Sequence, residues 1–344
     1  MKRVRRLGVF VSLVCICCAL SGGAHGSAAD KKEVQLLSVQ RIWDRAPHNA
    51  FTDLIRFRSR WYLVCREGED HISFDGILRV LSSKDGRHWN SMAVLEVPGA
   101  DLRDGKLSVT PEGILMLIAG ARRQTEPHTF ETMVWFSDNG RRWRGPTKVA
   151  DPDYWLWRVT WHKGLCYGIG YSCGARHNIR LYTSRDGREF STLVSTLYDR
   201  DYANETSIVF VENDTAVCLL RRDPEQGLLG ISAPPYTDWR WVSLGARIGG
   251  PHMLRLPDGR LLAAVRLYDE RQRTALCWVD RRQGRLTECL TLPSGGDTSY
   301  PGLVWYKDTL WVSYYSSHEG KAAVYLAQVK VPLVQKRPFR SAEA

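Results

Sequence analysis

Several sequence patterns that mark common enzyme chemistries are missing from this 344-residue chain. No GxGxxG segment follows a strand-like run, and there is no GxxxxGK(S/T) loop and no HExxH pair. These absences argue against a dinucleotide site, a phosphate-binding loop and a zinc protease site. None of the six cysteines beyond residue 26 lies in a CxxC pair, so zinc-ribbon or thioredoxin-like chemistry has no support. We therefore expect neither a cofactor nor a bound metal ion.

Helical periodicity is nearly absent as well. Beyond its N-terminus the chain is a series of short runs of β-branched and aromatic residues, separated by Gly, Asp, Asn and Pro. Such runs are typical of strands joined by tight turns, so the sequence predicts an all-β protein.

Apolar runs of membrane-spanning length are missing beyond the N-terminus. The first residues combine a basic start, an apolar run of about fifteen residues and a stretch of small residues. This is the pattern of a secretory signal peptide, since the apolar run is too short for a spanning helix. We predict cleavage after Gly26, which removes residues 1–26 and leaves a secreted or periplasmic protein without membrane insertion.

A concentrated basic stripe is missing too. The formal net charge is +11, and removal of residues 1–26, which hold four basic and no acidic side chains, lowers it to +7. The remaining positive charge is scattered along the chain, unlike that of nucleic-acid-binding proteins. The sequence thus predicts no nucleic-acid partner, and its mildly basic balance suits an acidic substrate.

What the sequence does contain is a repeated turn. It occurs as "SSKDGRHW", "FSDNGRRW" and "TSRDGREF", which end at Trp89, Trp143 and Phe190. Successive copies are 54 and 47 residues apart, and degenerate versions follow at Ser232 and near Asp280. A turn that recurs at a nearly constant period indicates repeated structural units. We expect its acidic or amide residue and its aromatic residue to fix a hairpin corner.

Six hairpins follow the same repeat. Each has a strand end, a turn with Gly, Asp or Ser and an apolar strand, and they lie at residues 57–66, 110–120, 161–171, 211–221, 256–266 and 305–315. A second strand pair after each hairpin gives units of about 53 residues, the size of a four-stranded blade. The sequence therefore predicts a six-bladed β-propeller of four-stranded antiparallel blades over residues 27–331, with a polar C-terminal tail at 332–344.

Charged residues recur at one position of these hairpins. Seven residues past the turn, the second strand ends at Arg66, Arg221 and Arg266 in the first, fourth and fifth units. Blades are related by rotation about a central axis, so we expect the three guanidinium groups to converge. The first strand of each hairpin begins at the same end because the strands are antiparallel. This adds Glu205 and Tyr300 to the same rim.

These residues resemble the sialidase (neuraminidase) superfamily, over essentially the whole chain beyond the leader. The repeated turn is similar to the Asp-box (BNR repeat) S-x-D-x-G-x-x-W, but one residue shorter. "NETSIVF" followed by Arg221 resembles the superfamily's glutamate and arginine of the fourth blade. "AAVR" followed by "DTSYPGL" resembles its third arginine and its nucleophilic tyrosine.

The resemblance implies a retaining, exo-acting glycoside hydrolase that removes a terminal sialic acid or a related acidic sugar. Arg66, Arg221 and Arg266 would bind the sugar carboxylate, because planar guanidinium groups pair with carboxylates through charge-assisted hydrogen bonds. Tyr300 would be the nucleophile and Glu205 its base, since a neutral tyrosine does not repel an anionic substrate as a carboxylate would.

The acid/base residue implied by the resemblance lies in "REGEDHISFDGILRV". Asp75 and Asp70 are both candidates, and Asp75 is preferred because it stands just before the strand that leads into the first repeated turn. His71 is expected nearby as a substrate-binding residue.

One departure from the superfamily pattern concerns the first strand of the first blade. It reads "HNAFTDLIRF" and lacks the arginine that the superfamily carries there in an R-I-P-like motif. The substrate is therefore a sialic acid, a related sugar acid or a different glycoside. Two alternatives to the hydrolase stay open, namely a non-catalytic propeller that binds glycans or proteins, and a polysaccharide lyase that uses tyrosine with His71 or His252.

A last expectation concerns Cys277 and Cys289. They flank the turn around "DRRQG" almost symmetrically, so in a regular antiparallel hairpin they face each other and are able to form a disulfide in an exported protein.

Overall fold

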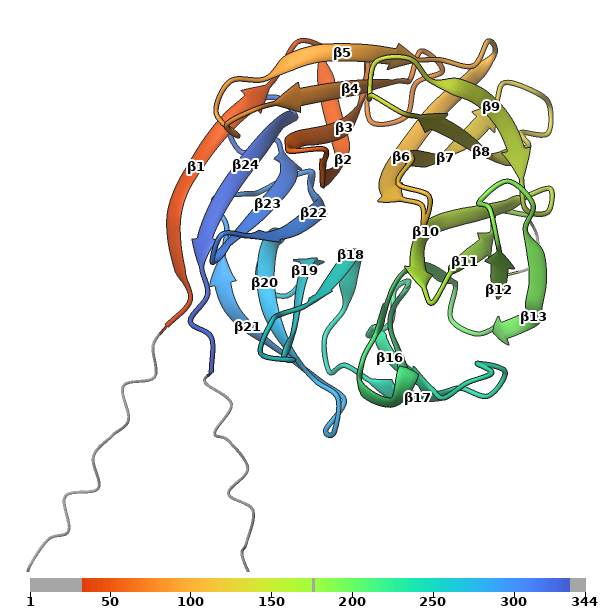
Figure 1. The fold of residues 1–344 in the computed structure, drawn as a ribbon, viewed down its shortest axis with the longest axis vertical. Coiled ribbons are helices and arrows are strands. Elements are labelled where there is room, and N and C mark those ends of the chain that lie inside the picture. Colours follow the sequence, from red (N-terminus) through yellow and green to blue (C-terminus); the bar gives the residue numbers. More distant parts are fainter. Residues whose placement is uncertain (1–32, 175–176, 335–344) are drawn as a thin grey trace, which may run out of the picture. The chain divides into compact units, whose positions relative to one another are not determined.

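The computed structural model describes residues 33–174 and 177–334. The predicted signal peptide and most of the predicted tail lie outside the described residues. The described part of the chain contains 24 strands, one short 3₁₀ turn η1 (Glu212–Asp214) and no α-helix. The strands form six four-stranded antiparallel sheets that stand around a central axis as a six-bladed β-propeller (Figure 1). The predicted fold class is confirmed.

The first three blades follow the chain in order. Their strands are β2 (His48–Phe57), β3 (Arg60–Gly68), β4 (Ile77–Ser83) and β5 (Asn90–Leu95); β6 (Ala100–Val109), β7 (Leu115–Arg123), β8 (Phe130–Ser137) and β9 (Arg144–Val149); and β10 (Tyr154–His162), β11 (Leu165–Ser172), β12 (Ile179–Ser184) and β13 (Ser191–Tyr198).

The other three blades comprise the remaining strands. These are β14 (Ala203–Phe210), β15 (Ala216–Arg222), β16 (Leu228–Ser232) and β17 (Arg240–Ser243); β18 (Ile248–Arg255), β19 (Leu261–Leu267), β20 (Arg273–Asp280) and β21 (Arg285–Thr291); and β22 (Thr298–Tyr306), β23 (Thr309–Ser316), β24 (Ala323–Lys330) and β1 (Gln35–Trp43).

The sixth blade is built from both ends of the described chain. Its outermost strand is β1, which pairs antiparallel with β24 from Gln35 opposite Lys330 to Trp43 opposite Val324. The sequence predicted a second strand pair after each hairpin, but only one strand follows the sixth. Pairing β1 with β24 supplies the fourth strand, and it closes the ring by joining the two ends of the propeller.

The hydrophobic core lies between the blades. Six clusters of buried residues each join two neighbouring blades, as in the one that packs Leu63 and Leu81 of blade one against Trp311 and Leu326 of blade six. Burial falls from the axis outward, from the almost completely buried β2 to the mostly exposed β9. The second strands of the blades, such as β7 and β19, are covered on both faces, so they read as continuous apolar runs without alternation.

The repeated turns join the third and fourth strands of their blades. In the first copy, Asp85 Oδ1 accepts the backbone N–H groups of Arg87 and His88 at 2.8 and 2.9 Å, and Trp89 Nε1 donates to the Gly86 carbonyl at 3.2 Å. Gly86 has φ 77°, a conformation that glycine adopts without strain. The acidic and aromatic residues therefore fix the corner of the hairpin.

The two cysteines of blade five do not face each other. Cys277 and Cys289 are both free thiols, and a register shift between Leu276 and Cys277 pairs Cys277 with Glu288. Cys277 belongs to the cluster shared with blade four and Cys289 packs against the cluster shared with blade six. A bulge changes the face to which side chains point, so the expected disulfide does not form.

The chain segments described by the structure contain no helix of the length and apolarity needed to cross a membrane.

Candidate active site

An irregularity of the backbone recurs at the start of every inner strand. The pairing of each inner strand with its neighbour shifts register within its first residues, in all six blades. The residues inside these shifts include Phe51, Asp104, Trp157, Glu205, Gly250 and Tyr300. Phe51, Trp157 and Tyr300 pack in one buried cluster where the first strands of the blades begin. Bulges re-aim side chains and occur often beside active sites.

Several of these residues adopt a backbone conformation that is costly for side-chain-bearing residues. Phe51, Asp104 and Tyr300 have φ values of 56°, 57° and 51°. Positive φ at non-glycine residues costs about 1–3 kcal/mol and concentrates at ligand-binding and catalytic sites. The end of the axis where they meet is thus the candidate active site.

Tyr300 and Glu205 are in direct contact at this position. The Tyr300 hydroxyl donates to Glu205 Oε1 at 2.5 Å, although the two residues are 95 positions apart in sequence. Arg221 Nη1 donates to the same Glu205 oxygen at 2.9 Å and to the Tyr300 hydroxyl oxygen at 3.3 Å. The backbone N–H of Gly250 donates to Glu205 Oε2 at 2.7 Å. Both carboxylate oxygens are therefore held in place.

The environment of Tyr300 keeps its phenol protonated. Burial raises the pKa of Tyr300 well above its usual value, and the negative charge of Glu205 raises it further, while Arg221 opposes the shift. The phenol therefore keeps its proton and donates it in the hydrogen bond to Glu205, which is positioned to receive it when electron density leaves the phenol oxygen.

The support beneath Tyr300 is a layer of buried charges. Lys106 Nζ lies 4.7 Å from the Trp157 ring and 5.7 Å from the Tyr300 ring. Burial, followed by the charge of Arg158, lowers the pKa of Lys106 to about 8. Arg158 is paired with Asp53 at 3.1 Å. This layer contacts Tyr300 through Lys106 and its neighbour Pro301 through Arg158, which donates to the Pro301 carbonyl at 3.3 Å.

A further carboxyl group of this site, Asp104, has the properties of a proton donor. Its side chain is 6% exposed, and its Oδ1 has no hydrogen-bond partner among the described residues. Burial raises the pKa of Asp104 to about 6, against the lowering effect of Lys106 and Arg103, and the charge of Glu205 raises it further. A carboxyl group with a pKa raised to about 6 keeps its proton in mildly acidic solution, where an ordinary aspartate is ionised, and this suits it to general acid catalysis.

Asp75 and Asp70, the two candidates predicted from the sequence, lie in a different environment from that of the buried Asp104. Both are exposed, on the loop between β3 and β4. Partial burial would raise the pKa of Asp75, but hydrogen bonds from Ser73 and from the backbone N–H of Glu69 hold it below its usual value. The carboxylate of Asp75 therefore remains charged, and it is less suited than Asp104 to donate a proton.

The three arginines predicted from the repeat do not form one clamp. Arg66 is fully buried, where it pairs with Asp101 at 2.7 Å and donates to the carbonyls of Asp70 and Ser73. Its guanidinium group holds the β3–β4 loop instead of facing the axis. Arg221 is the one of the three that hydrogen-bonds to the Glu205–Tyr300 pair.

Arg266 lies on the other side of Tyr300. Its guanidinium carbon is 5.5 Å from the Tyr300 ring centroid, and its Nη2 donates to Asp297 Oδ1 at 3.3 Å and to the Tyr315 hydroxyl at 2.9 Å. His71 reaches the same carboxylate, with its Nδ1 2.7 Å from Asp297 Oδ2. The structure thus connects the predicted Arg266 and His71 through a residue that was not predicted.

Sequence reasoning missed Asp104 and Asp297. Asp104 immediately precedes Gly105 and Lys106, where the inner strand was expected to begin, and the bulge extends that strand upstream by several residues. Asp297 stands three residues before Tyr300 in "DTSYPGL". In both cases the signal was an acidic residue at the edge of a predicted inner strand.

Comparisons with known proteins give structural matches only. No protein-family model matches the chain, and no curated protein matches its sequence. Among solved structures, a Dyadobacter fermentans protein of unknown function aligns with a TM-score of 0.76 at 18% identity, and the alignment covers 88% of this chain and 100% of that one.

Two other matches are structures of glycoside hydrolases. An α-L-arabinofuranosidase of Fusarium graminearum aligns with a TM-score of 0.67 at 14% identity, over 86% of this chain and 98% of the other. The sialidase of Trypanosoma rangeli aligns with a TM-score of 0.66 at 12% identity, over 82% of this chain and 55% of that enzyme. At these identities the matches show a shared six-bladed propeller fold.

Proposed function

We propose that this protein is a retaining, exo-acting glycoside hydrolase whose active site is centred on Glu205, Tyr300 and Asp104. The observation that carries the proposal is the buried hydrogen bond of 2.5 Å between Tyr300 and Glu205, two residues that lie in different blades. The similarity of the fold to a sialidase and to an arabinofuranosidase supports the same class of reaction.

The proposed reaction has two steps. In the first, Tyr300 attacks the anomeric carbon while Glu205 takes the phenolic proton, and Asp104 gives a proton to the departing glycosidic oxygen. In the second, the ionised Asp104 removes a proton from water, which attacks the anomeric carbon, and the proton on Glu205 returns to Tyr300 as the sugar leaves. Asp104 takes the acid/base role in this proposal in place of Asp75, because only Asp104 has a raised pKa.

The sequence resemblance favours an acidic sugar as the substrate, with Arg221 and Arg266 on its carboxylate. A second candidate is a neutral sugar such as an α-L-arabinofuranoside. It is favoured because both arginines already have carboxylate partners within the protein and are therefore less available to bind a sugar carboxylate. Arg266 is already bonded to Asp297, and Arg221 to Glu205. With a neutral sugar the carboxylate of Glu205 is not repelled by the substrate, so Glu205 becomes the nucleophile and Tyr300 its hydrogen-bond donor.

The test is a hydrolysis screen of the purified protein with aryl α-sialosides, other ulosonosides, uronosides and α-L-arabinofuranosides. We expect turnover of one class, with retention of anomeric configuration in the released sugar, and loss of that turnover in Glu205→Gln. Binding of a glycan with no hydrolysis of any class would favour a binding propeller. An unsaturated product would favour a lyase.

Export is part of the same proposal, since polymeric glycans are substrates met outside the cytoplasm. We expect protein recovered from the periplasm or the medium to begin at Ser27 in N-terminal sequencing. A chain that keeps its first 26 residues after expression in its native host would contradict cleavage at this site.

A further inference from the structure

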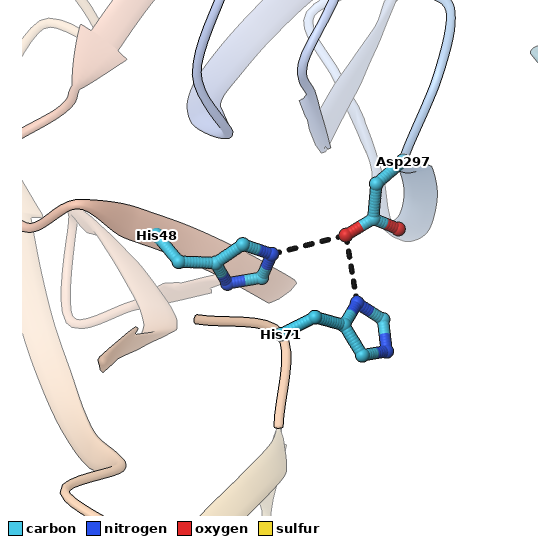
Figure 2. A group of neighbouring side chains, drawn as sticks. All are labelled: His48, His71 and Asp297. Atoms are coloured by element: carbon cyan, nitrogen blue, oxygen red, sulfur yellow. Dashed lines mark hydrogen bonds and ion pairs between the residues drawn. The ribbon is translucent and has the colours of Figure 1, made fainter. Parts of the chain in front are cut away.

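Two histidines converge on one oxygen atom beside the candidate active site. His48 Nε2 lies 3.0 Å and His71 Nδ1 lies 2.7 Å from Asp297 Oδ2, as Figure 2 shows. The three donor atoms all lie within 4.8 Å of one another. His48 belongs to β2, His71 to the β3–β4 loop and Asp297 to the β21–β22 loop. The group therefore joins blade one to blade six, across the closure of the ring.

Two of the three separations lie close to those between neighbouring ligands of a metal ion, and the third, between the two imidazole nitrogens, is at most 4.8 Å. Zinc binds imidazole nitrogen and carboxylate oxygen at about 2.0–2.2 Å, so adjacent ligand atoms of one ion stand about 2.9–3.4 Å apart for coordination angles between 90° and the tetrahedral value. The two distances to Asp297 Oδ2 reach this range with movements of a few tenths of an ångström. Imidazole and carboxylate ligands together suit zinc and neighbouring transition metals rather than Mg²⁺ or Ca²⁺.

The carboxylate is held from its other side as a metal ligand usually is. Asp297 Oδ1 accepts hydrogen bonds from the Tyr315 hydroxyl at 2.6 Å and from Arg266 Nη2 at 3.3 Å, and its backbone N–H donates to Ser317 Oγ at 2.9 Å. Such outer contacts orient the ligating oxygen and are a regular feature of built metal sites. They leave Oδ2 directed at the two imidazoles.

The accessibility of the group also suits an ion that exchanges with solvent. The His48 side chain is 9% exposed, whereas those of Asp297 and His71 are 27% and 40% exposed. One side of the group is therefore anchored in the protein, and the other is open to water or to a ligand. Phe51 lies against it, with its ring centroid 5.1 Å from that of His71 and 5.0 Å from that of Tyr300.

From this geometry we propose that His48, His71 and Asp297 bind one divalent transition-metal ion, with Zn²⁺ as the best-suited ion. Three protein ligands leave at least one coordination position for water or a sugar hydroxyl. The ion would tie the β3–β4 loop to the β21–β22 loop at the ring closure, next to Tyr300. The proposal differs from the expectation of no metal that came from the absence of CxxC and HExxH patterns, and it does not depend on the proposed glycosidase activity.

The test is a calorimetric titration of the protein with ZnCl₂. The protein is first freed of any affinity tag, treated with EDTA and dialysed. Equilibrium dialysis and mass spectrometry of the metal then check the stoichiometry. We expect one Zn²⁺ per chain and a higher thermal midpoint with the ion, because ligands that bind only the folded state stabilise it. His71→Gln should weaken binding by about 100-fold or more, since loss of even an outer contact of a metal ligand costs about 10–100-fold. Tyr315→Phe, which removes such an outer contact, should weaken it by about 10-fold.

His88→Gln is the matched control. His88 also lies 2.7 Å from an aspartate oxygen, that of Asp85, but no second imidazole is paired with this carboxylate. This variant should bind zinc like the wild type. His71 is on an exposed loop, so its replacement is expected to leave the fold intact, which circular dichroism will verify.

The visible absorption spectrum of bound Co²⁺ is an independent test of the site. Co²⁺ added to the wild type should produce visible absorption bands of a nitrogen- and oxygen-ligated ion, and His71→Gln should remove them. Absence of stoichiometric Zn²⁺ binding would overturn the proposal and leave the group as two histidines hydrogen-bonded to one carboxylate. Stoichiometric binding that survives in His71→Gln would overturn it as well, by placing the ion elsewhere.

Discussion

Two features recur around the propeller, the turns at its outer strands and the bulges at its inner strands, and they recur in different ways. The turns repeat both backbone and side chains. In the second copy Asn139 Oδ1 accepts the backbone N–H groups of Arg141 and Arg142, and in the third Asp186 accepts those of Arg188 and Glu189. The bulges share the backbone irregularity, but the residue at the bulge differs from blade to blade. These residues are Phe51, Asp104, Trp157, Glu205, Gly250 and Tyr300.

The difference follows from what each feature contacts. A turn makes its hydrogen bonds within its own hairpin, so the first three blades have the same requirement, and the equivalent residues Asp85, Asn139 and Asp186 meet it. A bulge places its residue at the axis, where the six blades meet, so five different side chains and the backbone N–H of Gly250 build one asymmetric site. Repetition of side chains indicates a structural need of the blade, and divergence on a repeated backbone indicates a shared functional site.

The largest effects are expected at the inner bulges. Glu205→Gln should lower kcat/KM by about 1,000-fold or more, because it removes the base or nucleophile of the reaction. Tyr300→Phe should do the same for an acidic substrate, but should lower kcat/KM only by about 10–100-fold if Glu205 is the nucleophile. Kinetics with the substrate identified in the screen measure both. Equal, small losses in the two variants would contradict the proposed pair.

Asp104→Asn should have the next largest effect, a loss of about 100-fold or more in kcat/KM. A general acid must be protonated, so wild-type activity should fall as the pH rises through about 6, the pKa of Asp104. The variant should lack this decline, and its loss should be smaller for substrates with nitrophenol leaving groups, which need no proton. Asp75→Asn is the control, and a larger loss there would return the acid/base role to Asp75.

The difference between turns and bulges also explains how much of this architecture the sequence predicts. The turns could be recognised because the same residue types recur in the sequence. Their period, together with the repeated hairpins, predicted six blades of four strands each. Glu205 and Tyr300 were predicted from strand starts and from the superfamily resemblance. Asp104 was not, because a bulge shifts which residue points inward without leaving a fixed sequence pattern. The roles of Asp297 and Arg66 were not predicted either, because both depend on contacts with residues distant in sequence, His48 and Asp101. The pairing of β1 with β24 is likewise a contact between the chain's two ends, with no local signal.

A smaller effect is expected at the turns. Asn139→Ala removes an acceptor of two backbone N–H groups at 2.9 and 3.0 Å, so we expect a loss of about 1–2 kcal/mol in the free energy of unfolding. The variant's kcat/KM should stay at the wild-type value, because the turn is distant from the axis. Urea denaturation and steady-state kinetics on the same samples measure the two quantities. A catalytic defect without a stability loss would break the distinction between turns and bulges.

The smallest expected effect is a difference in pH dependence between the two regions. The pKa of Asp104 is raised in the folded protein, so the folded state binds more protons than the unfolded one between about pH 4 and 6, and Asp104 destabilises the fold as the pH rises through this window. For Asp186, partial burial is outweighed by hydrogen bonds from the backbone N–H groups of Glu189 and Arg188, which lower its pKa, so its stabilisation is present above about pH 4 and is lost as the pH falls. Asp104→Asn should therefore raise the thermal midpoint relative to the wild type, and by more at pH 7 than at pH 4. Asp186→Ala should lower the midpoint relative to the wild type, again by more at pH 7 than at pH 4. Shifts of the same sign in both variants would contradict these assignments.

The most direct test of the account is to identify the residue that becomes covalently bound to the sugar. The protein is incubated with an activated fluorosugar matched to its proposed substrate class. The fluorosugar should form a covalent glycosyl adduct quickly, and the adduct should hydrolyse slowly. It is located by intact-mass measurement and peptide sequencing. The account predicts one sugar per chain, on Tyr300 for an acidic sugar or on Glu205 for a neutral one, and none in the corresponding Tyr300→Phe or Glu205→Gln variant. An adduct on any other residue, or turnover without an adduct and with inversion of configuration, would contradict it.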